Sequence, residues 1–121
     1  MTGSHRDRGS VTAEIAVALP GLVLITVAAL WGVSVASVQL ACTDAARSGA
    51  RAAARGEPPP AVRQFVARAL PTGAAVEVTR KGDQTQVDVT VQVRAPAPTG
   101  LAPLTVRARA TAVTEPGVVT P

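Results

Sequence analysis

The chain has 121 residues, of which 47% are hydrophobic and only 2% aromatic, and it carries a formal net charge of +4. One cysteine excludes an internal disulfide and a multi-cysteine metal site, and the single histidine, His5, lies in a polar tail, which argues against a histidine-based catalytic triad. No phosphate-binding loop, Cys–His pair or pair of acids at fixed spacing is present. We therefore expect no enzymatic activity, no cofactor, no metal and no small-molecule substrate.

An uncharged and largely apolar segment covers residues 15–43. As an α-helix it would measure about 44 Å, more than the roughly 30 Å hydrocarbon core of a bilayer. The rest of the chain is too short to cover such a helix on all sides, which excludes the buried helix of a soluble protein. We predict that the part from about 15 to 43 is transmembrane.

This segment lies inside a longer predicted helix that covers residues 10–55. Ser10 and Thr12 are both favourable N-caps, and Glu14 would then lie in the first turn, where the helix dipole favours an acid. Residues 1–9 precede the helix as a short polar, basic leader.

Two prolines bear on the long helix: one predicts a kink inside it, and the other predicts where it ends. Pro20 removes one backbone hydrogen bond, so we predict a kink there, which membrane helices tolerate. Residues 56–60, GEPPP, form a break, because Gly56 suits the C′ position and Pro58 forbids continuation of the helix.

Residues 61–121 predict a small outer α+β domain. Helical spacing of apolar residues predicts a short amphipathic helix over 61–70, with an apolar side of Val62, Phe65, Val66, Ala69 and Leu70. Alternation of apolar with polar residues then predicts strands over 76–80, 85–95 and 104–113, separated by a KGDQ turn and an APAPTGLAP loop. We expect a three-stranded antiparallel sheet with the helix on its valine face. So small a domain would be marginal alone, and we expect the long helix or a partner subunit to complete its core.

The stretch RGSVTAEIAVALPGLVLI, residues 8–25, contains a motif of four features. A basic residue and a glycine, Arg8 and Gly9, precede Ser10; an acid, Glu14, follows; and Pro20 lies six positions beyond the acid in an apolar helix. This arrangement resembles the signature of type IV pilin-like proteins, and within them the TadE-like family of tight-adherence (Flp) pilus assembly. The resemblance covers roughly residues 8–55.

The resemblance implies a cleavage site and an assembly residue. A membrane prepilin peptidase would cut between Gly9 and Ser10 on the cytoplasmic side, and Glu14 would guide the subunit into the growing filament. The residues agree with this, because an unpaired carboxylate at a membrane helix start is costly and the new α-amine of Ser10 would lie about one turn away. The amine of one subunit could pair with Glu14 of the next. The alternative is an interfacial acid that the helix dipole merely favours.

The implied protein is a minor pilin or pseudopilin of a Flp-type pilus or related export machine. It would be a single-pass protein of the cell membrane, with a cytoplasmic N-terminus and an extracytoplasmic C-terminal domain. Its partners would be membrane lipid, other pilin-like subunits, the prepilin peptidase and the pilus assembly platform. The alternative is a single-pass, membrane-anchored binding module that does not polymerise.

Small residues recur at helical spacing in two stripes, which lets membrane helices approach closely. The first stripe contains Ala28, Gly32 and Ala36, and the second contains Ala41, Ala45, Gly49 and Ala53. We predict that one of them is a helix interface, against the alternative that alanine richness produces them by chance. Near the middle of the apolar run, Trp31 predicts packing against another helix.

Cys42 and three arginines complete the candidates. Cys42 is expected to be a small apolar residue near the outer membrane boundary, since Gln39 does not fit a lipidation signal; an intermolecular disulfide stays open. Arg47, Arg51 and Arg55 form a basic stripe, which we interpret as a solvated face or an anchor to lipid phosphates. Nucleic-acid binding is not expected, because the aromatic residues that stack on bases are lacking.

Overall fold

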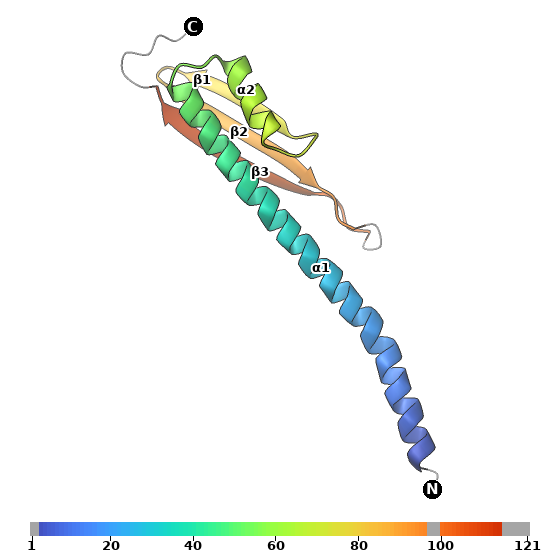
Figure 1. The fold of residues 1–121 in the computed structure, drawn as a ribbon. Coiled ribbons are helices and arrows are strands. Elements are labelled where there is room, and N and C mark those ends of the chain that lie inside the picture. Colours follow the sequence, from blue (N-terminus) through green and yellow to red (C-terminus); the bar gives the residue numbers. More distant parts are fainter. Residues whose placement is uncertain (1–2, 97–99, 115–121) are drawn as a thin grey trace. The chain divides into compact units, whose positions relative to one another are not determined.

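The computed structural model describes residues 3–96 and 100–114 (Figure 1). Two helices are followed by three strands, in the order α1 (Gly3–Ala54), α2 (Pro59–Arg68), β1 (Ala75–Lys81), β2 (Gln84–Val93) and β3 (Leu104–Val113). The strands form one antiparallel sheet in the order β1-β2-β3. This confirms the predicted α+β fold class. The chain divides into two compact units, Met1–Val33 and Ser34–Pro121.

The start of α1 differs from the prediction, because the helix begins at Gly3 and not near Ser10 or Thr12. The Thr12 hydroxyl donates a 2.9 Å hydrogen bond to the Arg8 carbonyl, which is the bond of a threonine inside a helix and not that of an N-cap. No proline in residues 1–9 stops the helix from extending through the leader. Glu14 therefore lies beyond the first turn, which contains no acid.

The end of α1 agrees with the sequence. Gly56 has a φ of +92°, and its N–H donates to the Ala53 carbonyl at 3.0 Å, while the Glu57 N–H donates to the Ala52 carbonyl at 3.3 Å. These two bonds form a Schellman motif with glycine at C′. Earlier in the helix, α1 continues past Pro20, and the kink there stays a prediction.

The sheet follows the predicted alternation. Val76 and Val78 of β1 pair with Val89 and Val87 of β2, so valines meet on one face. A two-residue turn joins β1 to β2, with Gly82 at a φ of +62° in its first central position. Positive φ at that position alone is the type II′ turn, which suits the twist of a hairpin.

The core of the Ser34–Pro121 unit lies between the valine face of the sheet, α2 and the carboxyl-terminal part of α1. The buried hydrophobic residues from α1 are almost all alanines, and those from the other elements are valines. The cluster consists of Cys42, Ala45, Ala46, Ala50, Ala52, Ala53, Val62, Val66, Val87, Val89, Val91 and Val106. The expectation that the long helix completes this core is confirmed.

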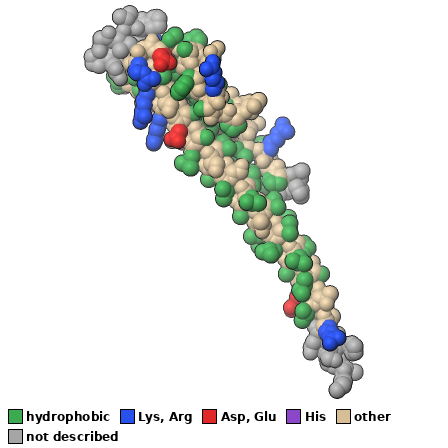
Figure 2. Space-filling model, viewed as in Figure 1, with side chains coloured by type: hydrophobic (Ala, Val, Ile, Leu, Met, Phe, Trp, Pro, Cys, Tyr) green, Lys and Arg blue, Asp and Glu red, His purple; other side chains and the backbone are tan. Residues whose placement is uncertain are grey.

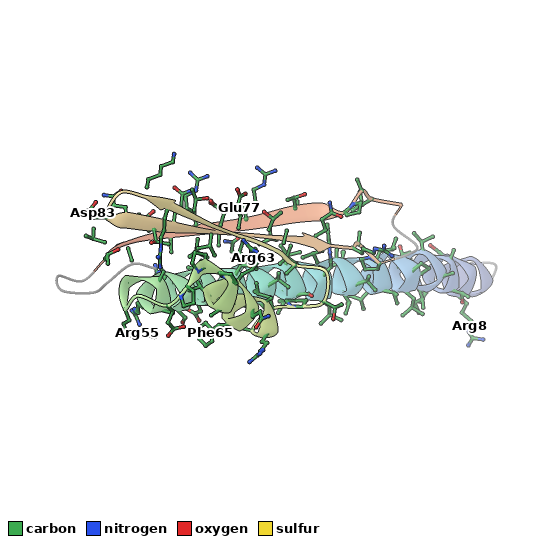
Figure 3. The ribbon with its side chains drawn as sticks, turned by 90° about the horizontal axis from the view of Figure 1, so that it is seen from above. Arg8, Arg55, Arg63, Phe65, Glu77 and Asp83 are labelled. Carbon is green, nitrogen blue, oxygen red and sulfur yellow. The ribbon has the colours of Figure 1, made fainter. Side chains whose placement is uncertain are left out.

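Close approach of α1 and α2 depends on Gly49. A Cβ at this position would overlap Val66 Cγ2 and would lie 3.5 Å from both Val62 Cγ1 and Val87 Cγ1. Only two residues of α2, Val62 and Val66, are buried, so the side of this helix that faces the core is narrow. Phe65, predicted on the apolar side, is instead 49% exposed. In Figure 3 it points away from the sheet, on the side opposite to Glu77.

Candidate functional site

The amino-terminal part of α1 is apolar and largely exposed. Large side chains such as Val17 and Ile25 are 77% and 69% exposed, and the most apolar window of the helix has no buried residue. Figure 2 shows hydrophobic side chains along this part of the helix. The helix is long and apolar enough to cross a membrane, which is compatible with a single-pass anchor.

The exposed apolar stretch is shorter than the segment predicted from the sequence. From residue 34 onward α1 belongs to the second unit, where Val35 and Val38 pack against the core and Cys42 is fully buried. Residues 15–33 contain no buried residue, although Val27 and Trp31 are partly covered, and as a helix they measure about 28 Å. That length matches the roughly 30 Å hydrocarbon core of a bilayer.

The Gly9–Ser10 bond lies inside α1, ahead of this stretch. Apart from its chain neighbours and the helix's own backbone, a Cβ on Gly9 would meet no described atom within 4 Å, so no other part of the described chain covers this position. Ser10 and Glu14 are four residues apart and share a helix face, separated by about 6 Å along the axis. The structure thus brings the candidate cleavage bond and the candidate assembly acid to one surface of one helix.

Glu14 is exposed at the start of the apolar stretch. Between Arg8 and Asp44 the sequence contains no other charged residue. Among the side chains that the structure describes, none forms an ion pair with Glu14. A carboxylate that enters the edge of a membrane without a partner is costly, so this position favours contact with a cation from outside the described chain.

The two stripes of small residues have different surroundings. Ala45, Gly49 and Ala53 of the second stripe pack inside the chain's own core. In the first stripe, Ala28 and Ala36 are exposed and a Cβ on Gly32 would meet nothing within 4 Å. The first stripe therefore stays a prediction of a helix interface, whereas the second is an interface within one subunit.

Cys42 lies in the core of the folded unit, and the arginine stripe lies on its surface. Cys42 is fully buried against the sheet, so its thiol is a core group and cannot reach a neighbouring chain in the folded unit. Arg47, Arg51 and Arg55 are exposed, and Arg55 lies 3.5 Å from Glu57 in an exposed ion pair. This agrees with a solvated face. The described residues contain no group of three or more His, Cys, Asp or Glu that could hold a metal.

Two polar contacts that hold the second unit together were missed by the sequence analysis. Gln39 Nε2 of α1 donates a 3.2 Å hydrogen bond to the Arg107 carbonyl of β3. Arg80 donates from its guanidinium to the Glu57 carbonyl at 2.8 Å and so ties β1 to the α1–α2 connection. The signal for Arg80 was available, because it continues the inward phase of Val76 and Val78 in β1.

The outer face of the sheet is polar. Arg109 Nε donates to Asp88 at 2.6 Å, and Gln86 Nε2 donates to the other carboxylate oxygen at 2.6 Å. These hydrogen bonds, that of Gln86 first, hold the pKa of Asp88 below its ordinary value. Since Arg109 is 68% exposed, the pair orders the surface more than it stabilises the fold.

The comparisons with known proteins bear on the helix and on most of the chain. A family model described as TadE-like protein matches residues 9–51, which lie within the range on which the resemblance was based. A protein of Mycobacterium tuberculosis (strain ATCC 25618 / H37Rv), named as an apoptosis inhibitor, is 43% identical over 105 residues, which cover 86% of this chain and 78% of the relative. No solved structure matches the chain at a significant level.

Proposed function

Because the chain belongs to the TadE-like family, we propose that it is a non-enzymatic, pilin-like subunit of a tight-adherence (Flp) type pilus or related export machine. Family membership points to a protein associated with the Tad pilus; the more specific role is that of a minor pilin or pseudopilin. Its partners are other pilin-like subunits, the prepilin peptidase and the pilus assembly platform.

The observation that carries this proposal is the position of Glu14. It is an acid with no ion-pair partner among the described side chains, at the start of a largely exposed apolar helix, and it is the fifth residue after the Gly9–Ser10 bond. A free membrane anchor has no need of such an acid, whereas a subunit that packs against another subunit's α-amine neutralises both charges. The pairing also sets the register between neighbouring helices.

In this proposal, residues 15–33 cross the cell membrane once, with residues 1–9 in the cytoplasm. The Ser34–Pro121 unit lies outside the cytoplasm. The length of the exposed apolar stretch supports this topology, because about 28 Å of helix matches the thickness of the hydrocarbon core of a bilayer.

Cleavage needs the helix to open around Gly9, because a peptidase must reach a backbone that α1 holds in hydrogen bonds. Glycine inside a helix costs about 1 kcal/mol relative to alanine, which lowers the cost of opening the helix at Gly9. Removing Arg8 also removes the carbonyl to which the Thr12 hydroxyl donates. After cleavage the helix starts near Ser10, and Glu14 comes to lie close to the new positive end.

The test is the Glu14→Gln variant, which keeps size and hydrogen bonding but removes the charge. We expect normal membrane abundance and an N-terminus at Ser10, together with loss of co-isolation with other pilus subunits. Asp44→Asn is the matched control, because Asp44 is also an exposed acid on α1 but lies outside the motif. Unchanged partner recovery for Glu14→Gln would sink the assembly role.

A second candidate is a membrane-anchored binding module that does not polymerise. The observation in its favour is the relative that is named as an apoptosis inhibitor, a name that describes no pilus. The N-terminus of the protein from its native membrane separates the two candidates. Met1 or Thr2 at that terminus, in cells that contain the peptidase, would favour the binding module.

A further inference from the structure

We propose that Leu104, at the start of β3, and Arg94 and Leu101, in the connection between β2 and β3, rest on the phospholipid headgroups of the membrane that α1 crosses. This inference rests on the membrane insertion of residues 15–33 in the proposed function. It adds a second lipid contact, made by the folded unit itself.

The hydrogen bond between Gln39 and Arg107 fixes the level of β3 along α1 within the Ser34–Pro121 unit. Figure 1 shows β3 alongside α1, with both running toward the same end of the unit. Leu104 precedes Arg107 by three residues, or about 10 Å of strand. Ser34 precedes Gln39 by five residues, or about 7.5 Å of helix. Leu104 therefore lies at or slightly beyond the level of Ser34, where the exposed apolar stretch of α1 ends.

The side chains at this end suit a lipid surface. Leu101 and Leu104 are 57% and 45% exposed, although they are large apolar residues. Arg94, which follows the last residue of β2, is also exposed, and Val93 beside it pairs with Leu104. Leucines can enter the boundary between headgroups and acyl chains while the arginine reaches a phosphate.

The charge distribution favours phosphate as the partner. Residues 91–106 contain one basic residue, Arg94, and no acid. The acids Glu77 and Asp88 lie farther along the strands, in the direction away from Leu104. Each basic side chain near an anionic lipid surface strengthens association by roughly fivefold. A neighbouring protein surface is the competing occupant, but the continuity with the membrane-length stretch of α1 favours lipid.

The test uses the full-length chain in lipid vesicles with single cysteines that carry a nitroxide probe, in a Cys42→Ala background. Leu101→Cys reports on the proposed contact, Val113→Cys reports on the opposite end of β3, and Val23→Cys reports on the membrane segment. Val113 is a matched control because it is 56% exposed, close to the exposure of Leu101. The measurement is the accessibility of each probe to oxygen, which enters lipid, and to a water-soluble nickel complex.

We expect a lipid environment at position 23, a headgroup depth at position 101 and water at position 113. Equal water exposure at positions 101 and 113, with position 23 in lipid, would overturn the inference while leaving the membrane anchor intact. Water exposure at position 23 would instead overturn the proposed membrane insertion. Shielding at position 101 that disappears when each vesicle holds one chain would assign the contact to a neighbouring subunit, which also overturns the inference.

The charge contribution is tested in the same system. In vesicles that contain phosphatidylglycerol, the probe at position 101 reports how much of the Ser34–Pro121 unit lies on the lipid surface and how much lies in water. Arg94→Ala should lower the ratio of lipid-bound to water-exposed unit by roughly fivefold. Arg63→Ala is the control, because Arg63 is an exposed arginine of α2 outside the proposed surface. An equal effect of the two variants would contradict a specific role of Arg94.

Discussion

Replacement of Gly49 by alanine tests the closest helix contact in the folded unit. Two opposing effects decide the outcome. Alanine in a helix interior is favoured over glycine by about 1 kcal/mol. An added methyl group in a well-packed core costs about 1–3 kcal/mol. The new Cβ would overlap Val66 Cγ2, and because Val66 is fully buried, it can move aside only against other atoms of the core. We therefore expect the upper part of that range, and a net loss of about 1–2 kcal/mol in the free energy of unfolding.

Cys42 provides the assay, because it is the single cysteine of the chain and is fully buried in the same core. Under conditions where the unit closes faster than the thiol reacts, the rate of alkylation follows the population of the open state. A loss of 1–2 kcal/mol should raise that rate by a factor of about 5–30. The measurement is made on the full-length chain in detergent micelles.

The double variant Gly49→Ala/Val66→Ala makes the reasoning specific. Val66→Ala alone should raise the alkylation rate by leaving a cavity. In the double variant the Cβ added at position 49 no longer collides with Val66 Cγ2, because that methyl group is gone. The alkylation rate should therefore be lower than the rate calculated from the sum of the two single free-energy changes. Gly32→Ala is the control, because a Cβ at Gly32 meets no atom within 4 Å. An unchanged rate for Gly49→Ala, or strictly additive effects in the double variant, would refute the close-packing argument.

Three further predictions concern the sheet. Val89→Asp should bury a charge and destabilise the unit by several kcal/mol, whereas Thr90→Asp on the outer face should change little; equal effects in thermal unfolding would contradict the strand assignment. Arg80→Met removes the hydrogen bond to the connection between α1 and α2 and should cost about 1–2 kcal/mol, visible as faster proteolysis of residues 55–58. The pKa of Asp88 is lowered from 3.8, so its contribution to stability is complete above pH 3.8 and is lost as the pH falls through the lowered value. On acidification the unfolding temperature of the wild type should therefore fall slightly more than that of Asp88→Asn, and an identical decrease would show that the carboxylate contributes nothing.

The strands and the turn between the first two could be predicted because their signals are local. The alternation of valine with polar residues in β2 fixes which side chains share a face, and Gly82 marks the hairpin turn. The end of α1 was equally local, since Gly56 and Pro58 act on the backbone next to them. The motif of Gly9 and Glu14 could also be recognised from the sequence, because its residues lie close together along the chain.

The partners of α1 could not be predicted in the same way. The stripe of Ala45, Gly49 and Ala53 indicated a close contact, but small residues do not tell whether the contact is with another subunit or with the chain's own sheet. Phe65 was assigned to the wrong side because the width of the seam beside α2 depends on Gly49, which lies on a different element. The hydrogen bond from Gln39 to β3 joins residues 68 positions apart, and no local pattern reports on such a contact.

That hydrogen bond also bears on how molecules of this chain meet one another. β3 is an edge strand of ten residues, and an edge of that length is a template for pairing with a strand from another molecule. Membrane proteins that collect at one place bring many such edges close together. Because Gln39 Nε2 donates to the carbonyl of Arg107, one backbone acceptor of β3 already has a hydrogen-bond partner. A strand from another molecule would therefore have to displace the Gln39 amide or pair without the Arg107 carbonyl.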